Sequence, residues 1–335
     1  MLKCGIIGFG GLGKVHFNNL LKMEKSGAGV RVTALCDVER DSFMAKTATN
    51  IGESSGVADL SPYRLYSSAD DMLAKEELDF AIAAVPTYLH SGIAVSALGR
   101  GVHMFSEKPM ALTLEQCQAM LDAAAASGKL LMIGQCLRYW PEYRKLKELV
   151  DGGEYGKVVR AEFSRLSATP LWSWQNWYMD HERSGGAAMD LHVHDVDMIN
   201  WLFGVPEAVT SVATHGVSKF DSISTAYHYA DKAVSAIADW GLAAKYPFGM
   251  GFCVRFENAV AAMNAQGFHI YTQDEALEPE LPKDDAYYCE IADFMRCIRD
   301  GAAIEINPPE SSMRTLKITL AEKESALAGK RVAIS

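Results

Sequence analysis

The side chains best suited to chemistry lie in the stretch SGGAAMDLHVHDVDMINWLFG, residues 184–204. It places Asp190, His192 and His194 within five positions and adds Asp195 and Asp197 directly afterwards. Histidine suits proton transfer because its ordinary pKa, about 6.5, lies near neutral pH, and a carboxylate beside it can orient the ring. As a strand, the segment would put Asp190, His192 and His194 on one face, which would favour a metal site.

The rest of the stretch favours a helix. The strand alternation loses its phase at Asp195, whereas apolar residues continue at helical spacing to the closing glycine, a typical helix end. In a helix, Asp190 and His194 lie one turn apart on the same face, and His192 points elsewhere. We therefore expect Asp190 and His194 to form a pair and His192 to be a packed or surface histidine. Asp195 and Asp197 are expected to be solvated or to cap the helix.

A lysine occupies the end of an expected strand. The apolar segments LDFAIAAVP and VHMFSEKP are separated by the helical pattern TYLHSGIAVSALGRG. Strands that alternate with helices predict a right-handed, doubly wound parallel sheet, where ligands bind beyond the carboxyl ends of the strands. Pro86, Thr87 and His90 follow one such end, and Glu107 and Lys108 lie at another. We expect these residues to contact a dinucleotide, with Lys108 close to its nicotinamide.

The dinucleotide signal itself is a glycine-rich turn. LKCGIIGFGGLGKVH passes from a strand pattern through Gly8, Gly10 and Gly13, the GxGxxG spacing, into a helical pattern. The first glycine permits the tight turn, the second lets a pyrophosphate approach the backbone, and the third lets helix and strand pack closely. The expected cofactor-binding turn also contains Phe9, Gly11 and Leu12.

An acidic residue, Asp37, ends the next expected strand, VRVTALCD, at a suitable distance beyond the glycines. Its carboxylate would accept hydrogen bonds from the adenosine ribose and repel a 2′-phosphate, so NAD is favoured over NADP. Arg40 lies close enough to weaken that preference. The alternative role for Asp37 is that of a turn or cap residue.

The composition limits the classes of function. The 335 residues predict about two domains, and 49% hydrophobic with 22% charged residues is ordinary for a globular protein. A net charge of −10 argues against a nucleic-acid partner. Seven cysteines at irregular spacing suit a reducing compartment. Without a signal-peptide pattern or an apolar run of about 20 residues, a cytoplasmic protein with no membrane span is expected.

Four motifs in order, GFGGLG, VPTYLH, EKP and GGAAMDLHVHDVD, together resemble the glucose-fructose oxidoreductase/inositol dehydrogenase (Gfo/Idh/MocA) family. The resemblance covers essentially the whole chain, since GQCLRYWPEYRKLKELVDGGEYGKV resembles the family's inter-domain segment. It implies a Rossmann domain, residues 1–134, and a substrate-binding and oligomerisation domain, residues 135–335, with a large, mostly antiparallel open sheet. It also implies an NAD(P)-dependent oxidoreductase that acts on a sugar or polyol.

The family motif implies that Lys108, Asp190 and His194 are the catalytic residues. His194 would be the general base, Lys108 would bind the reacting oxygen, and Asp190 would orient the imidazole or bind a neighbouring hydroxyl. The bond between this lysine and the following proline is often cis in the family. Arg138, in LRYWP, resembles a residue that reaches the family's substrate, with a salt bridge as the alternative. His192 stands where the family often has glycine and would narrow or line the pocket.

In the second half, strands are expected over GKVVRAEFSRLSA, EAVTSVATHGVS, KAVSAIADWGL, GMGFCVRFEN and AVAAMNAQGFHIYT. Their closeness in the chain favours antiparallel pairing. Helices are expected over PEYRKLKELVDGG, AYYCEIADFMRCIRDG and ESSMRTLKITLAEKESALAG. Trp172, Trp174 and Trp177 are expected to pack, with one of them at the pocket mouth.

Two other functions stay open at this point. One is an NAD-using glycoside hydrolase, which would show no net formation of NADH. The other is a sugar or dinucleotide sensor without catalysis, although the presence of Lys108, Asp190 and His194 weighs against it. Relatives bury one face of the second sheet against a partner, so the resemblance implies a homodimer or homotetramer. No metal is expected at the site.

Overall fold

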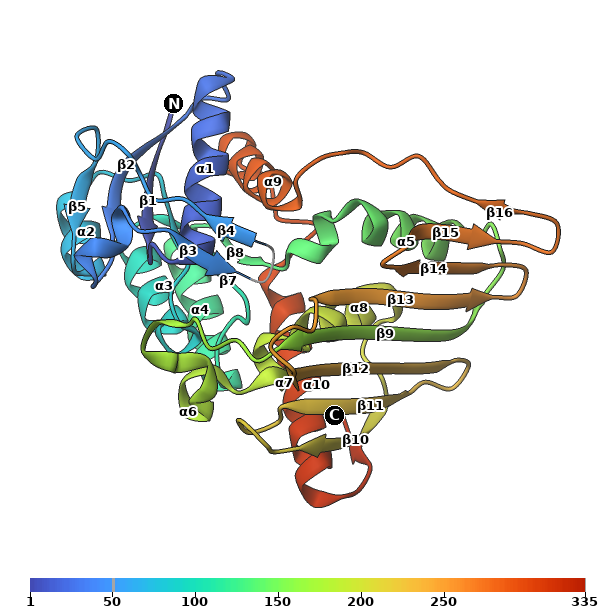
Figure 1. Cartoon of the computed structure of the whole chain (residues 1–335). Coiled ribbons are helices and arrows are strands. Elements are labelled where there is room, and N and C mark those ends of the chain that lie inside the picture. The colour runs from blue at the N-terminus through green and yellow to red at the C-terminus, as the bar shows by residue number, and fades with distance from the viewer. Residues whose placement is uncertain (50–51, 335) are drawn as a thin grey trace. The chain divides into compact units, whose positions relative to one another are not determined.

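The computed structural model describes residues 1–49 and 52–334, and the chain divides into two units (Figure 1). The first unit comprises residues 1–136 with 285–313, and the second comprises residues 137–284 with 314–335. The first change of unit lies close to the expected boundary after residue 134, but the return of 285–313 to the first unit differs from the expectation.

Helix α9, Ala286–Asp300, explains that difference. Its Phe294 packs edge-on against Phe80 and Phe105 of the first sheet, with ring centroids 5.9 Å apart in both pairs. Such aromatic burial ties the helix to the first unit although it follows the second in sequence.

The sheet of the first unit has six parallel strands in the order β5-β2-β1-β6-β7-β8. Its strands are β1 Leu2–Ile7, β2 Val30–Cys36, β5 Arg64–Tyr66, β6 Phe80–Ala83, β7 His103–Glu107 and β8 Leu131–Gly134. The strand order reverses between β1 and β6, which is the position where doubly wound sheets bind ligands. The predicted parallel Rossmann sheet is confirmed.

Helices cover both faces of this sheet. Helix α1, Gly11–Lys25, packs beside α9, whereas α2, Ala69–Lys75, α3, His90–Gly99, and α4, Leu114–Ser127, pack with one another. Shorter elements are the 3₁₀ turns η1 Arg40–Phe43, η2 Thr87–Leu89 and η3 Cys136–Tyr139 and the antiparallel strands β3 Thr47–Thr49 and β4 Gly52–Ser54.

The second unit is built on a nine-stranded sheet in the order β16-β15-β14-β13-β9-β12-β11-β10-β17. Its strands are β9 Val158–Ala168, β10 Ala208–Thr214, β11 Ser222–His228, β12 Ala233–Leu242, β13 Gly249–Phe256, β14 Val260–Asn264, β15 Gly267–Tyr271, β16 Ala276–Leu277 and β17 Val332–Ala333. Strands β9 and β12 pair parallel and the other neighbours pair antiparallel, so the mostly antiparallel sheet is confirmed.

Three details of this sheet differ from the sequence pattern. Strand β11 was not expected, because its sequence SISTAYH contains mostly small polar residues and few strongly apolar ones, so the alternation typical of a strand is weak. The segment AVAAMNAQGFHIYT forms the hairpin of β14 and β15 rather than one strand. The parallel pair of β9 and β12 was also unexpected, since their closeness in the chain favours antiparallel pairing.

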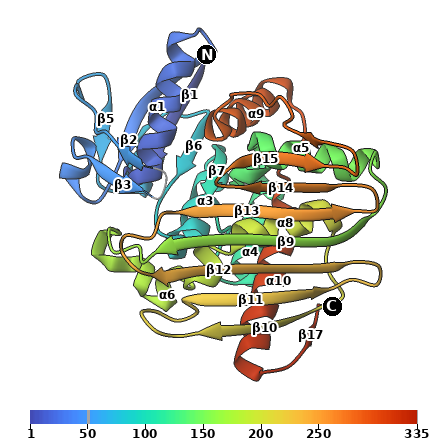
Figure 2. The same ribbon diagram turned by 45° about the vertical axis from the view of Figure 1, so that its right-hand side comes forward.

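The helices of the second unit lie on one side of its sheet. They are α5 Pro141–Gly152, α6 His181–Ser184, α7 Ala187–Asp190, α8 Val193–Phe203 and α10 Pro309–Ala328, with the turn η4 Trp174–Met179. Figure 2 shows α5, α8 and α10 behind the strands, with no helix of the second unit in front of them among the described residues. Along β12 burial alternates, and the outward Ile237 is 37% exposed. Within the part of the chain described, no helix has both the length and the hydropathy that a membrane span requires.

Candidate active site

The glycine-rich turn after β1 has the conformation that dinucleotide binding needs. Gly8 has a φ of 86°, and a Cβ there would lie 2.4 Å from the Ala84 carbonyl oxygen, so only glycine fits. A Cβ at Gly13 would lie 2.0 Å from the Gly8 carbonyl oxygen, as close packing of helix and strand requires. At Gly10, the N-cap of α1, an added Cβ would meet nothing within 4 Å, and the first turn has no acidic residue. The positive end of α1 is therefore open to a phosphate group.

Asp37 lies at the carboxyl end of β2 and stabilises the same turn. Its carboxylate accepts hydrogen bonds from the backbone N–H of Phe9 at 2.6 Å and of Glu39 at 2.8 Å. Lys14 of α1, which the sequence interpretation missed, hydrogen-bonds the Thr47 hydroxyl. Burial lowers the pKa of Lys14, and the charge of Asp37 opposes that shift. The turn role of Asp37 is thus confirmed, and its contact with a ribose stays a prediction.

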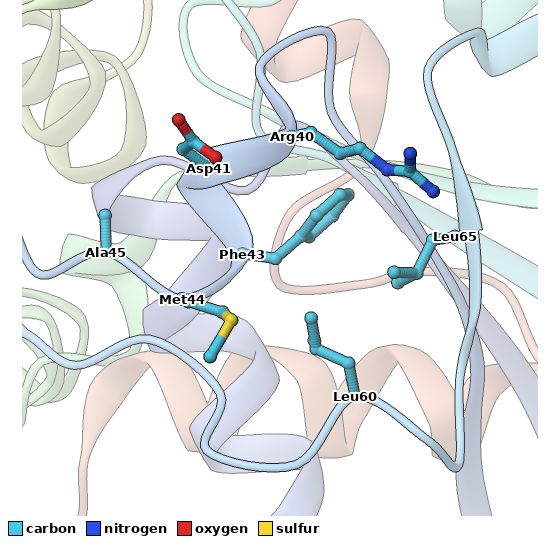
Figure 3. A pocket seen from close by; sticks show the side chains of 7 residues that line it. All are labelled: Arg40, Asp41, Phe43, Met44, Ala45, Leu60 and Leu65. Carbon is cyan, nitrogen blue, oxygen red and sulfur yellow. The ribbon is translucent and has the colours of Figure 1, made fainter.

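A pocket of about 490 Å³ opens directly after this aspartate (Figure 3). The side chains of Phe43, Met44, Leu60 and Leu65 point toward one another inside it, and Arg40 lies at its edge beside Leu65. An apolar pocket with a single cation at its edge suits a flat heteroaromatic ring that carries an anionic group nearby.

The ends of β6 and β7 carry the other expected cofactor residues. Thr87 is 1% exposed, and its hydroxyl has no hydrogen-bond partner among the described residues. The buried His90 ring faces two carbonyl oxygens, with Nδ1 2.8 Å from Pro109 and Nε2 2.9 Å from Val85. Burial lowers the pKa of His90, so the neutral ring donates to only one of these oxygens at a time. His90 therefore joins the loops after β6 and β7.

The peptide bond between Lys108 and Pro109 is cis, as the resemblance implied. Glu107 is 4% exposed, and Lys108 is the one partly exposed residue in the otherwise buried stretch 104–111, all of which is described. Backbone N–H of Lys108 donates to the Glu107 carboxylate at 3.2 Å. The lysine side chain is thus the accessible group of the EKP motif.

The stretch 184–204 is helical, as predicted, but in two pieces. Helix α7 ends at Asp190 and α8 begins at Val193, and the His192 N–H donates to the Ala187 carbonyl five residues earlier at 2.8 Å. Asp190 is 8% exposed, and His194 is the one partly exposed residue between positions 184 and 200, a range described throughout. The expected proton-transfer group is therefore the accessible one.

The expectation for Asp195 and Asp197 was wrong, since both are fully buried. Asp195 pairs with Arg165 of β9 through hydrogen bonds of 3.0 and 3.1 Å. Asp197 pairs with Arg138 of η3 at 2.7 and 2.8 Å. The ion-pair alternative for Arg138 is thereby confirmed, and at 1% exposure its side chain is poorly placed for the expected contact with substrate.

His192 is packed rather than surface-exposed. Its Nε2 lies 3.3 Å from Glu322 of α10 and 3.2 Å from the Tyr227 hydroxyl of β11. Burial raises the pKa of Tyr227, and the nearby Glu322 raises it further. Because His192 is 0% exposed, it fixes α8 on the sheet rather than lining a pocket.

Two protein-family models match this chain, one in each of its two units. The family model described as "Oxidoreductase family, NAD-binding Rossmann fold" matches residues 2–135, and the "GFO/IDH/MocA C-terminal domain" matches residues 143–262. This chain belongs to the Gfo/Idh/MocA family.

Individual relatives agree with that membership. The scyllo-inositol 2-dehydrogenase (NAD(+)) of Bacillus subtilis is 24% identical over 90% of this chain and 87% of its own length. The 2,7-anhydro-N-acetylneuraminate hydratase of Mediterraneibacter gnavus is 27% identical over 72% of this chain and 63% of its own length. Several curated relatives, this hydratase among them, are matched over less than two thirds of their length. The fold is similar to that of levoglucosan dehydrogenase in complex with NADH, at a TM-score of 0.84 and 19% identity over 100% of this chain and 99% of the other.

As a Gfo/Idh/MocA protein, the chain has a first unit that is an NAD-binding Rossmann domain. The residues present fit the dinucleotide: Gly10 leaves space at the helix end, and the buried Thr87 hydroxyl lacks a partner among the described residues. These features would hold the pyrophosphate and the nicotinamide side respectively.

Two further features of this family member were not anticipated. Trp172 and Trp174 are 40% and 36% exposed, whereas the expectation placed only one of the three tryptophans outside the packing, at a pocket mouth. A buried group of His16, Glu107 and Glu290 offers ligand atoms within 4.8 Å of one another. No local pattern indicates this group, because its members lie on three elements far apart in the chain.

Proposed function

We propose that this protein is an NAD(P)-dependent dehydrogenase that oxidises or reduces a secondary alcohol carbon of a sugar or polyol. The supporting observation is shared by both units: Lys108 and His194 are each the single partly exposed side chain within a buried motif. Accessible ionisable groups in otherwise buried motifs are characteristic of sites that bind substrate. The names of the inositol and levoglucosan dehydrogenase relatives support the substrate class.

In the proposed mechanism, both groups act on one substrate oxygen. The Lys108 ammonium hydrogen-bonds that oxygen and stabilises its developing negative charge. His194 accepts the hydroxyl proton, and Asp190 orients the imidazole or binds a neighbouring hydroxyl. The bound nicotinamide supplies the acceptor for the hydride that leaves the same carbon. The alcohol thus becomes a ketone, and one proton is released.

The dinucleotide would follow the turn after β1. Gly8 to Gly13, including Phe9, Gly11 and Leu12, would bind the pyrophosphate at the N-terminus of α1. Asp37 would accept the ribose hydroxyls, and the pocket beside Arg40 would hold the adenine. Pro86, Thr87, His90 and Glu107 would line or support the nicotinamide side. The Asp37 carboxylate at the adenosine ribose would favour NAD over NADP.

The test is substrate-dependent formation of NADH with a panel of inositols, anhydrosugars and free sugars. Lys108→Ala should lower kcat by at least about 100-fold because it removes the charge stabilisation of the reacting oxygen. NADH affinity, followed by fluorescence, should change by less than about twofold. The matched control is Lys25→Ala, which removes an exposed lysine at the end of α1 and should leave both quantities unchanged. A large loss of NADH binding in Lys108→Ala would contradict the assignment.

A second candidate is a reaction that uses the nicotinamide transiently and forms no net NADH. The similarity to a hydratase of an anhydro-sugar favours it, and a glycoside hydrolase of the same fold would behave alike. Product analysis by mass spectrometry, with no change in NADH absorbance, would identify this reaction. Tight dinucleotide binding without any turnover would instead indicate a sensor.

We also propose a cytoplasmic homodimer or homotetramer. All seven cysteines are free thiols, which suits a reducing compartment. A second copy would cover the strand face of the second unit that has no helix in front of it.

A further inference from the structure

A buried cluster of three ionisable side chains adjoins the EKP motif. His16 from α1 and Glu290 from α9 are 0% exposed, and Glu107 from β7 is 4% exposed. Their nearest nitrogen and oxygen atoms lie within 4.8 Å of one another, and all three belong to the first unit. The proposed reaction assigns no task to His16 or Glu290.

The geometry favours a shared proton over a metal ion. The His16 Nε2 lies 2.6 Å from a Glu107 oxygen, the distance of a short charge-assisted hydrogen bond, and an ionised carboxylate can only accept in such a bond. Two ligands of a tetrahedral zinc ion, each at about 2.0–2.1 Å from it, would lie roughly 3.3 Å apart. The pair is therefore too close to share one ion without moving.

Glu290 is the member that must hold a proton. Neither of its carboxyl oxygens has a hydrogen-bond partner among the described residues, although the side chain is fully buried. Burial raises the pKa of Glu290 well above its ordinary value, and the negative charges of Glu107 and Asp285 raise it further. A lone buried carboxylate beside another carboxylate is strongly disfavoured, so the neutral acid is the stable form at pH 7.

The charges that act on Glu290 among the described residues, those of Glu107 and Asp285, are both negative. The charged or titratable groups that face it are Glu107 from β7, His16 from α1, Asp285 at the N-cap of α9, Tyr287 from α9 and Cys136 at the start of η3. Burial raises the pKa of both Tyr287 and Cys136, so these two stay neutral and polar.

Glu107 connects this cluster to the lysine. One oxygen of its carboxylate accepts the His16 hydrogen bond, and the other accepts the backbone N–H of Lys108 at 3.2 Å. A Cβ at Gly134 would come within 3.3 Å of the same carboxylate, so the neighbouring strand leaves just enough room for it. We propose that His16, Glu107 and a proton-bearing Glu290 form a network that positions Lys108 at the end of β7.

The role of Lys108 in this inference rests on the proposed function. The existence of the network does not depend on that function. Loss of the Glu290 proton would put a second negative charge beside Glu107 and repel its carboxylate. The contact between Glu107 and the Lys108 backbone would then loosen, and activity would fall on the alkaline side. The three side chains are positioning residues, since none of them contacts substrate in this scheme.

The direct test is infrared difference spectroscopy of the full-length protein, which separates protonated from ionised carboxyl groups. The wild type should show a carboxylic acid C=O band at neutral pH that disappears in Glu290→Gln. Glu148→Gln, which removes an exposed carboxylate on α5, should leave the band intact. If the Glu290 variant does not fold, the wild-type band can still be titrated and should vanish only well above pH 7. Absence of the band from the wild type at pH 7 would overturn the proposal, whatever reaction the protein catalyses.

Metal content provides the second discriminating measurement. Protein purified without chelators should contain far less than one equivalent of zinc or manganese, and neither Zn²⁺ nor Mn²⁺ should raise its melting temperature through this cluster. Stoichiometric metal that is retained by the wild type and lost in Glu290→Gln would overturn the proton assignment.

Kinetics test the positioning role. Glu290→Gln, with a neutral group of equal size, should keep kcat at pH 7 within about threefold and lose the alkaline decline. Glu290→Ala should lower kcat by about 10- to 100-fold with little change in NADH affinity, because a misplaced catalytic group costs rate rather than binding. An equal loss in Glu290→Gln and Glu290→Ala, with an unchanged pH profile, would contradict the positioning role.

Discussion

At the residue scale, Asp37 has a structural role in the glycine turn and a proposed role in binding a ribose. It holds the glycine turn through the Phe9 N–H and is available, by its position after β2, to the ribose of a dinucleotide. The nearby Arg40 at the pocket edge favours the opposite cofactor, because a guanidinium binds a 2′-phosphate well. We therefore expect cofactor preference to depend on the balance between these two charges.

Removing the charge of Asp37 should shift that balance. Asp37→Asn is expected to raise the KM for NAD⁺ about tenfold and to lower the KM for NADP⁺, since the amide is a poorer acceptor and no longer repels phosphate. The measurement is the ratio of kcat/KM for the two cofactors. Asp122→Asn, which removes an exposed carboxylate on α4 outside the pocket, serves as the control. An unchanged ratio in Asp37→Asn would rule out the ribose contact.

At the scale of elements, helix α8 is attached to its sheet by buried polar pairs. Asp195 and Asp197 meet arginines on β9 and η3, and Asp197 also accepts the Thr315 hydroxyl of α10 at 2.9 Å. Buried pairs of this kind fix the rotation of a helix more than they add net stability. That rotation decides whether His194 is accessible.

Replacing one member of such a pair should therefore lower the free energy of unfolding more than replacing both members together. Arg138→Met and Asp197→Leu are each expected to lower the free energy of unfolding by about 3–5 kcal/mol, because each leaves an uncompensated buried charge. The double variant should lose much less than the sum of the two. Urea unfolding of the four proteins measures this coupling, and strictly additive losses would show that the pair does not act as a unit.

Lys323 on α10 predicts a pH-dependent stability. Burial lowers its pKa to about 8, and the nearby Lys219 lowers it further, while Glu182 opposes the shift. Between pH 8 and the ordinary lysine pKa the unfolded chain binds more protons at this residue, so stability should rise with pH across that window. Below pH 8 Lys323 is charged in the folded protein, so the full destabilisation from burying its ammonium group is present.

Lys323→Met should thus stabilise the protein by about 1 kcal/mol at pH 7 and by progressively less as the pH approaches 10. Thermal melts at several pH values measure the difference from wild type. Lys330→Met, which replaces an exposed lysine after α10, should show no such trend. A gain that is constant with pH would mean that the charge of Lys323 is not its cause.

At the scale of the whole molecule, local patterns predicted the elements well and long-range partners poorly. The helices α5, α9 and α10 begin and end within a residue or so of their sequence patterns, since capping and periodicity are local properties. The turn from Gly8 to Gly13 was predictable for the same reason. By contrast, the partners of Asp195 and Glu290 come from distant strands and helices, and only the tertiary fold brings them together.

The return of residues 285–313 to the first unit has the same origin. The amphipathic pattern of α9 predicts a helix with an apolar face but does not say which core receives it. The packing of Phe294 on Phe80 and Phe105 decides that question, and no local signal encodes it.

The proposed oligomer is also a property of the whole molecule. The strand face without a covering helix carries partly exposed apolar residues such as Ile237 and Val212. Light scattering after gel filtration should give twice or four times the mass of 36.6 kDa. Ile237→Lys should shift the protein toward the monomer, whereas Leu327→Lys, an exposed site on α10, should not. A wild type that is monomeric at micromolar concentration would refute the proposed oligomer.

In the proposed mechanism, Lys108 of the first unit and His194 of the second act on the same substrate oxygen beside a bound nicotinamide. The most direct measurement is a crystal structure of the complex with NAD⁺ and a polyol that supports turnover. We predict a hydroxyl oxygen within about 3.2 Å of both the Lys108 Nζ and an imidazole nitrogen of His194. A bound polyol whose oxidised carbon faces the nicotinamide while either of these nitrogens lies out of hydrogen-bonding reach would contradict the account.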